Sequence, residues 1–239
     1  MKFCGICQNE FPAFEIYGIP EKRGRCPACG GKSRSRAVAW YFEKNIAPRM
    51  KPGSRILEIG ASKVGVRNLR APRFIGAAEH TVVDLVRKDI HREIKPPHIF
   101  LQMNAERLEF SAASFDFVTC NHALGFIPNY ENVLREIRRV LKPDGEAMLN
   151  TPLRPGPSVS TEALKAAHPE YPEDYYAENG TAWHFGEDYL DALRAAGFSV
   201  RTEYPFRDLS PEELKRGGMK HDMGVVSFQE CKEVKDYYE

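Results

Sequence analysis

Short blocks of apolar residues follow one another through the middle of the chain, and each ends at an acidic, polar or small residue. Their length and their content of β-branched and aromatic residues are typical of buried strands. The predicted strands cover residues 55–59, 80–84, 99–103, 114–120, 146–150, 198–202 and 224–228.

Segments with helical spacing of apolar residues separate several of these strands. Val133, Leu134, Ile137 and Val140 share one helix face, so the pattern predicts an amphipathic helix that begins near Pro128. Further helices are predicted over residues 33–46, where Ser33 or Ser35 can cap the first turn, over a short stretch at 66–70, over 187–196 and from Pro211. Residues 142–145 are predicted to form a turn. Strands alternating with helices predict a doubly wound α/β domain.

The N-terminal segment carries two C-x-x-C pairs, Cys4 with Cys7 and Cys26 with Cys29, separated by eighteen residues. Four cysteines at this spacing can hold one tetrahedral Zn²⁺, and disulfides are the weaker alternative in a reducing compartment. We therefore predict a zinc ribbon over residues 1–32 with a structural metal, because a catalytic zinc needs an open position. A connecting helix is expected within 33–52.

The strand at 55–59 leads into a turn that contains Gly60, Ala61 and Ser62. The spacing of Gly60 and Gly65 is that of a dinucleotide-binding turn, but Ser62 stands where the middle glycine lets a pyrophosphate touch the backbone. The acid Glu58, two residues before Gly60, favours a cationic ligand that lacks phosphate. S-adenosylmethionine, with a sulfonium and an ammonium group, has this chemistry.

Polar residues also follow the next strands at the same predicted edge of the sheet. Asp84 ends its strand where an acid can accept hydrogen bonds from ribose hydroxyls. Asn104, Ala105 and Glu106 follow the next strand, within reach of an adenine ring that Leu108 and Phe110 would flank. Asn121 and His122 leave the strand after that.

These segments resemble those of the class I S-adenosylmethionine-dependent methyltransferases, of the type 11 kind. The resemblance is strong over about residues 53–152 and rests on 57–60, 104–106, 115–118 and 134–145. The last segment is the most specific, although Asp144 replaces the first glycine of the usual R-V-L-K-P-G-G.

The resemblance implies a Rossmann-like seven-stranded sheet whose last strand is antiparallel, in a domain over residues 53–239. It implies cofactor contacts at Glu58, Gly60, Asp84, Ala105, Glu106 and the Asn121–His122 segment. Together with the ribbon, the chain is similar to bacterial methyltransferases, some of which act on ribosomal RNA guanines. Relatives often carry a D-H-x-R-like stretch before the F/Y-G-x-D-Y element, and residues 180–184 depart from it, which puts a shared substrate in doubt.

Residues 153–186 are rich in proline and aromatic residues, and in this fold the segment is expected to cover the substrate as a lid. Most of its aromatic side chains are expected to serve packing. His122 and His184 are the candidate general bases, since histidine titrates near neutral pH. Asp144 and Tyr189 are weaker candidates, and Cys120 is expected to pack inside its strand.

The net charge of the chain is +1, but residues 1–49 hold nine Lys and Arg against four Glu, a local net of +5 that leaves −4 for the remainder. Arg34 and Arg36 can therefore contact phosphate or another anion, or simply be solvated. Three functions stay open: methyl transfer to a small molecule or sugar, RNA methylation with the basic ribbon holding phosphates, and a non-catalytic module that binds cofactor or nucleic acid. The Asn-Pro-Pro-aromatic signature of base-amino methylation is absent.

No apolar run has the length of a membrane span, and Met1–Cys4 contains no hydrophobic signal region. We therefore expect a cytoplasmic protein that does not contact membranes.

Overall fold

The computed structural model describes residues 1–17, 22–170, 180–203, 209–218 and 225–229. Its centre is a seven-stranded sheet with the order β12-β13-β9-β8-β5-β6-β7. These strands are β5 (Arg55–Ile59), β6 (Glu79–Asp84), β7 (Ile99–Gln102), β8 (Phe115–Asn121), β9 (Leu141–Asn150), β12 (Ser199–Glu203) and β13 (Val225–Gln229).

Strands β7, β6, β5, β8 and β9 are parallel, whereas β13 pairs antiparallel with both β9 and β12. The chain proceeds from β5 outward to β6 and β7, and then returns to add β8 on the other side of β5. The carboxyl ends of β5 and β8 therefore form the topological switch point, where ligands bind in folds of this kind. The Rossmann-like fold class predicted from the sequence is confirmed.

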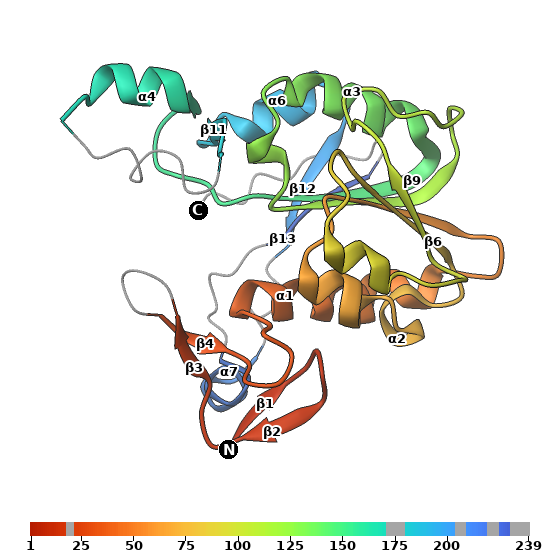
Figure 1. Ribbon diagram of the computed structural model, residues 1–239, viewed down its shortest axis with the longest axis vertical. Coiled ribbons are helices and arrows are strands. Elements are labelled where there is room, and N and C mark those ends of the chain that lie inside the picture. Colours follow the sequence, from red (N-terminus) through yellow and green to blue (C-terminus); the bar gives the residue numbers. More distant parts are fainter. Residues whose placement is uncertain (18–21, 171–179, 204–208, 219–224, 230–239) are drawn as a thin grey trace.

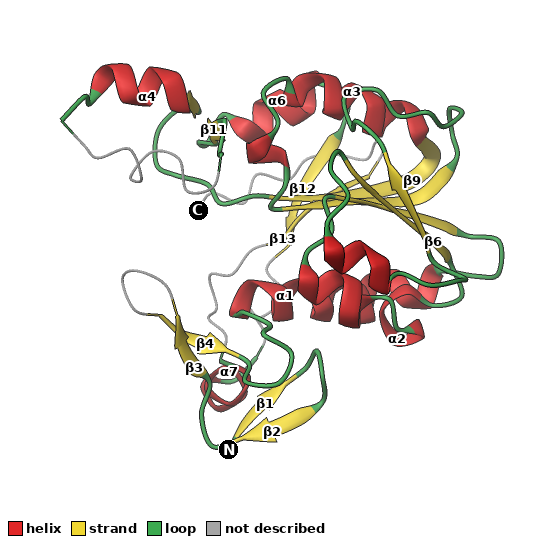
Figure 2. Ribbon diagram, in the orientation of Figure 1, coloured by secondary structure: helices red, strands yellow, loops and turns green. Residues whose placement is uncertain are grey.

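Helices cover both faces of the sheet, as Figures 1 and 2 show. On one face lie α1 (Ser33–Tyr41), its π-helical and 3₁₀ extensions at Phe42–Ile46 and Ala47–Arg49, the π-helical turn Gly65–Leu69, and α2 (Pro72–Ile75). On the other face lie α3 (Tyr130–Val140) and α6 (Tyr189–Ala195). Short 3₁₀ turns occupy Asp89–Glu93 and Leu124–Phe126.

Alternation along the strands separates two hydrophobic cores. Leu57, Val118 and Leu149 point toward α3 and α6, into a core that also holds the buried positions of both helices. Ile56 and Phe117 point the other way and pack with α1 and α2. Because successive strand residues face opposite sides, nearly continuous apolar runs are what a sheet covered on both faces requires.

The N-terminal segment folds as two small hairpins, one from β1 (Lys2–Cys4) and β2 (Asn9–Phe11), the other from β3 (Glu15–Tyr17) and β4 (Lys22–Arg25). It shares the second core with α1 and the sheet, since Cys4, Ile6 and Phe14 pack in that cluster. Helix α7 (Pro211–Gly217), from between β12 and β13, lies against β1. The ribbon is thus held between two elements of the larger domain.

The segment after β9 forms a two-stranded pair, β10 (Val159–Ser160) with β11 (Trp183–His184), and helix α4 (Thr161–Ala167). It docks on the turn that follows β8, because the amide of Ala182 donates to the carbonyl of Gly125 (2.8 Å) and the Trp183 indole donates to the carbonyl of Pro128 (2.8 Å). Figure 1 shows this segment beside α6. Part of the predicted lid, residues 171–179, lies outside the described residues.

Two local predictions were wrong. Neither Ser33 nor Ser35 caps α1, since Lys32 occupies the N-cap position and makes no side-chain capping bond. Residues 142–145 are not a separate turn but a bulge within β9, because Leu141 pairs with Phe115 whereas Glu146 already pairs with Phe117.

Candidate functional site

The loops that leave four parallel strands meet at one edge of the sheet. The amide of Gly60 donates to the carbonyl of Val83 (2.9 Å), and the amide of Met103 donates to the carbonyl of Asp84 (3.0 Å). The sheet order places the ends of β5, β6, β7 and β8 side by side. The predicted residues at these four strand ends therefore share one edge.

Gly60 makes a turn that no other residue fits well. Its φ is +69°, and a Cβ at this position would lie 2.5 Å from the Cβ of Ala123, in the loop after β8. Ser62 closes the next turn by accepting a hydrogen bond from the amide of Gly65 (3.1 Å). Ala61 is buried against Val66. The loop thus holds its shape through Ser62, without the middle glycine that a pyrophosphate requires.

Glu58 lies on the face of the sheet that α1 covers. Its carboxylate pairs with the Nε2 atom of His80 at 3.1 Å, and only 11% of its side chain is exposed. It lines a cavity with Val38, Thr119 and Asn121. Glu58 is therefore a largely buried acid at the switch point, and the imidazole of His80 is its partner.

Asp84 ends β6 with its side chain only 10% exposed. One carboxylate oxygen accepts from the amide of Val86 (3.2 Å), and the other accepts from the ammonium of Lys88 (2.7 Å). The carboxylate is thus fixed at the strand end, where two lone-pair positions per oxygen leave room for further donors.

The segment after β7 is held by its own side chains. Asn104 accepts from the amide of Glu106 (2.9 Å), and Glu106 accepts from the amide group of Asn129 (3.0 Å). Ala105 and Leu108 are buried in the first core, so they anchor the loop that carries the two polar residues.

Asn121 and His122 leave β8 beside Gly60. The side chain of Asn121 accepts from Asn150 (3.3 Å), and the amide of His122 donates to the carbonyl of Asn150 (2.7 Å). His122 has a φ of +56°, a conformation that is uncommon for residues other than glycine and clusters at functional sites. Burial, reinforced by the charges of Arg34 and Lys32, lowers the pKa of His122 to about 4, so its imidazole is neutral at pH 7.

The other candidate bases lie in different surroundings. His184 is in β11, where its Nε2 atom lies 3.2 Å from the hydroxyl of Thr161. Tyr189 is buried beneath the sheet with its hydroxyl on the carbonyl of Leu149, and burial raises its pKa well above the usual range. Asp144 is exposed near the beginning of β9, at the opposite edge. Tyr189 and Asp144 therefore cannot act at the carboxyl edge.

Cys120 is fully buried in β8, and burial raises the pKa of its thiol to about 12, as expected for a packing residue.

The aromatic side chains of the predicted lid serve packing. Trp183 and Phe185 contact Tyr130 edge-on, with ring centroids 5.3 and 4.9 Å from that of Tyr130. Phe110 packs edge-on against Phe115 in the same way.

The four N-terminal cysteines converge. Their sulfur atoms all lie within 4.8 Å of one another, and both Cys4 with Cys29 and Cys7 with Cys26 have Sγ–Sγ distances of 3.7 Å. A tetrahedral zinc site with bonds of about 2.3 Å requires sulfur atoms about 3.8 Å apart. The cluster therefore fits a Zn²⁺ ion.

One predicted anion-binding residue has a structural role instead. Arg36 is buried, stacks on the ring of Phe14 at 4.2 Å, and donates to the carbonyls of Gly31 (2.9 Å) and Gly218 (2.9 Å). It joins the ribbon, α1 and the end of α7. Arg34, by contrast, is exposed.

Sequence reasoning missed the partners that lie beneath the site. His80 is a buried polar residue of β6, and this position inside a strand was the only signal of its pairing with Glu58. Thr119 is 3% exposed, and its hydroxyl has no hydrogen-bond partner among the described residues. Both residues line the cavity beside Glu58.

Residues 57–149 match the family model described as a methyltransferase domain. A demethylmenaquinone methyltransferase of Lactococcus lactis is 40% identical over 67 residues, which are 28% of this chain and 27% of that protein. A sterol 24-C-methyltransferase of Gibberella zeae is 29% identical over 199 residues, 77% of this chain and 50% of that protein. The chain thus spans half or less of the length of these two relatives.

The fold is also that of solved methyltransferases. An S-adenosylmethionine-dependent methyltransferase of Mesorhizobium loti superposes with a TM-score of 0.59 and 17% identity, covering 84% of this chain and all of the other. The 1,6-didemethyltoxoflavin-N1-methyltransferase of Burkholderia thailandensis, bound to 1,6-didemethyltoxoflavin and S-adenosylhomocysteine, superposes with a TM-score of 0.52 and 18% identity, covering 82% of this chain and 79% of the other. Residues 57–149 thus match a methyltransferase domain, and the sheet has the fold of solved S-adenosylmethionine-dependent methyltransferases.

Proposed function

We propose that the protein is a methyltransferase that uses S-adenosylmethionine and a small-molecule acceptor. The observation that carries this proposal is the acid-and-glycine turn, Glu58 with Gly60, at the switch point of the sheet within the matched domain. The cofactor carries two positive groups, a sulfonium and an ammonium, which suit the buried acid Glu58. It has no phosphate, which suits a turn where Ser62 stands in place of the middle glycine.

Each strand end has a part in holding the cofactor. Asp84 would accept hydrogen bonds from the ribose hydroxyls, and Asn104, Ala105 and Glu106 would meet the adenine. Glu58, Gly60 and Ala61 would bound the methionine end, with Asn121 and His122 across from them. Bound S-adenosylmethionine would supply an electrophilic methyl group to a lone pair of the acceptor, and the electrons of the S–CH₃ bond would stay on sulfur.

His122 is the better placed of the two candidate bases. It precedes Ala123, which lies against the Gly60 turn. Its imidazole is neutral at pH 7 and would accept the acceptor's proton as a weak base, because burial lowers its pKa to about 4. His184 is a second candidate only if the lid brings it to the acceptor, since its ring nitrogen lies beside Thr161.

Two observations support a class of acceptor: the acceptors that the relatives' names give, and the contacts made by the cations in residues 1–49. The curated relatives include quinone and sterol methyltransferases, whose acceptors are small molecules. The RNA alternative relied on free cations in residues 1–49, but Arg25 pairs with Glu15, Arg36 is buried, and Arg49 pairs with Glu146. We therefore prefer a small molecule, a sugar included, over RNA.

A structural Zn²⁺ held by Cys4, Cys7, Cys26 and Cys29 completes the proposal. Four thiolates leave no open position on a tetrahedral ion, so the metal would stabilise the ribbon and take no part in methyl transfer.

Methyl-labelled cofactor tests this function. Purified protein is incubated with the labelled cofactor and either a small-molecule extract of cells or total RNA, and an Asp84→Ala variant serves as the control. We expect label in the small-molecule fraction, reduced at least tenfold in the variant. Label in RNA would replace our acceptor class, and no label in either fraction would favour the non-catalytic alternative.

A further inference from the structure

The carboxylate of Glu58 is held from two directions. Its Oε2 atom lies 3.1 Å from the Nε2 atom of His80, in the neighbouring strand β6. Its Oε1 atom lies against Gly65, where an added Cβ would come within 2.7 Å of that oxygen. The carboxylate therefore fills the space between His80 and the turn that follows β5, and a side chain at position 65 would displace it.

His80 is an unusual residue for the place that it occupies. It is 3% exposed, and its Nδ1 atom has no hydrogen-bond partner among the described residues. A buried polar atom without a partner costs stability, whereas an apolar side chain would fill the same space without that cost. Residues that break such a local rule are expected at functional sites.

The strand on the other side of Glu58 also places a buried polar residue beside it. Thr119 in β8 is the register partner of Glu58, and its hydroxyl has no hydrogen-bond partner within the described part of the chain. Glu58, His80 and Thr119 line one small cavity between the sheet and α1. Because Thr119 makes no bond to the carboxylate, His80 is the neighbour that fixes the position of Glu58.

The position of Glu58 in turn bears on the turn at the cofactor site. Ser62 accepts a hydrogen bond from the amide of Gly65 (3.1 Å), so the residue against which Glu58 lies also closes the turn that begins at Gly60. A shift of the carboxylate would change both the shape of this turn and the place of the acid.

We propose that His80 is a positioning residue of the methyltransferase site, which holds the carboxylate of Glu58 beneath the turn at 60–65. With its proton on Nε2, a neutral imidazole donates toward the carboxylate. His80 is too deeply buried to meet the cofactor, so it acts through Glu58. The inference rests on the proposed function, in which Glu58 faces the positively charged groups of S-adenosylmethionine.

Side chains of different reach test this role in the full, zinc-loaded chain. His80→Gln keeps an amide N–H near the place of Nε2, whereas His80→Asn is too short to bring one to Glu58 and His80→Leu has none. His98→Asn is the control, because His98 packs edge-on against His80 (5.7 Å between ring centroids) but pairs with no carboxylate among the described residues. Calorimetry measures the affinity for S-adenosylhomocysteine, and thermal unfolding shows which variants are folded.

Loss of one charge-assisted contact should weaken the binding of S-adenosylhomocysteine by about tenfold in His80→Asn and in His80→Leu. His80→Gln should stay within about threefold of the wild type, and His98→Asn should bind as the wild type does. A double variant shows whether the effect passes through Glu58. In a Glu58→Gln background, His80→Asn should weaken binding by less than about twofold further.

Equal affinity in the wild type and in the folded variants His80→Asn and His80→Leu would overturn the role of His80. An equal loss in His80→Gln and His80→Asn would overturn it too, as would a full tenfold loss in the Glu58→Gln background, because either result makes His80 a packing residue. Failure of the wild type to bind S-adenosylhomocysteine would instead contradict the proposed function on which this role depends.

Discussion

At the scale of single residues, the site depends on two backbone conformations that side chains tolerate poorly. Gly60 turns the chain out of β5, and His122 turns it out of β8, both with positive φ. The two turns touch, since Ala123 lies directly against Gly60. The glycine was recognisable from the sequence, because only glycine adopts this conformation without cost. The strained histidine was not, because nothing in its neighbours signals it.

Gly60→Ala should destabilise the protein more than Gly53→Ala does. Both positions have positive φ, +69° and +85°, so both changes carry a backbone cost of about 1–2 kcal/mol. A Cβ at Gly53 meets nothing within 4 Å, whereas one at Gly60 collides with Ala123. We expect an extra loss of about 1–3 kcal/mol in the free energy of unfolding for Gly60→Ala, measured with urea. Equal losses would show that the two loops do not touch.

His122 should make the protein less stable in acid. Its folded pKa of about 4 lies below the unfolded value of 6.5, so between these pH values the unfolded state binds the extra proton. The free energy of unfolding should therefore fall as pH decreases from 6.5 to 4. His122→Asn, which tolerates positive φ, should lose less stability over that window. Parallel pH profiles for the two proteins would contradict the buried environment assigned to His122.

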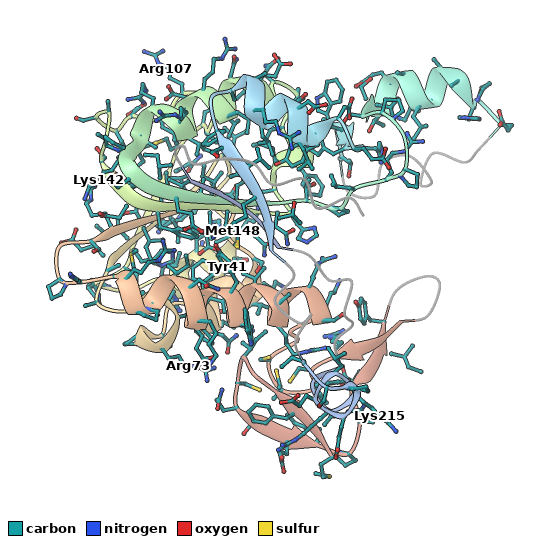
Figure 3. All side chains as sticks on the ribbon, turned by 180° about the vertical axis from the view of Figure 1, so that it is seen from behind. Tyr41, Arg73, Arg107, Lys142, Met148 and Lys215 are labelled. Atoms are coloured by element: carbon teal, nitrogen blue, oxygen red, sulfur yellow. The ribbon has the colours of Figure 1, made fainter. Side chains whose placement is uncertain are left out.

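At the scale of elements, α1 covers one face of the sheet and does not only connect the ribbon to it. Tyr41 donates from its hydroxyl to Glu146 in β9, and Arg49 binds the other oxygen of the same carboxylate (2.8 Å). Figure 3 shows Tyr41 and Met148 together between the helix and the sheet. Sequence analysis found the helix and the strand from their periodicity. It did not find this contact, because the two residues are 105 positions apart and a single sequence carries no signal for such a pair.

Tyr41→Phe should measure how firmly α1 is attached. It leaves the Glu146 side chain, which is only 2% exposed, with one partner fewer, at a cost of about 1–3 kcal/mol in the free energy of unfolding. Tyr130→Phe is the control, since its hydroxyl has no hydrogen-bond partner within the described residues. In a double-mutant cycle, adding Glu146→Gln should recover part of the loss. Additive losses would mean that the two side chains act independently.

At the scale of the whole molecule, the ribbon and the α/β domain share one core. The sequence predicted a zinc ribbon over residues 1–32 and a connecting helix after it, but not the ribbon's other neighbours, because cysteine spacing reports only the local site. In the structure, Arg73 from α2 donates to the carbonyl of Gly5 (3.1 Å), and Arg216 from α7 pairs with Glu10. Figure 3 shows Arg73 below the helices that cover this face of the sheet, on the side of the ribbon, and Lys215 of α7 beside the ribbon. None of the described helices is long and apolar enough to cross a bilayer.

Removal of the metal should therefore affect the entire protein. Because metal binding contributes folding free energy and the ribbon packs against α1, chelation or Cys26→Ser should lower the temperature of a single unfolding transition. Cys120→Ser, outside the cluster, is the control for loss of a thiol and should keep one zinc per chain. A separate low-temperature transition, with the main one unchanged, would show that the ribbon is an independent unit.

The account as a whole depends on cofactor binding at the carboxyl edge of β5, β6 and β8. Calorimetric titration of S-adenosylhomocysteine into the wild type and into Asp84→Ala tests it most directly. We predict saturable one-to-one binding by the wild type, weakened about tenfold in the variant because a fixed carboxylate no longer meets the ribose. Absence of binding by folded wild-type protein, or equal affinity in the two proteins, would contradict the site that we assign.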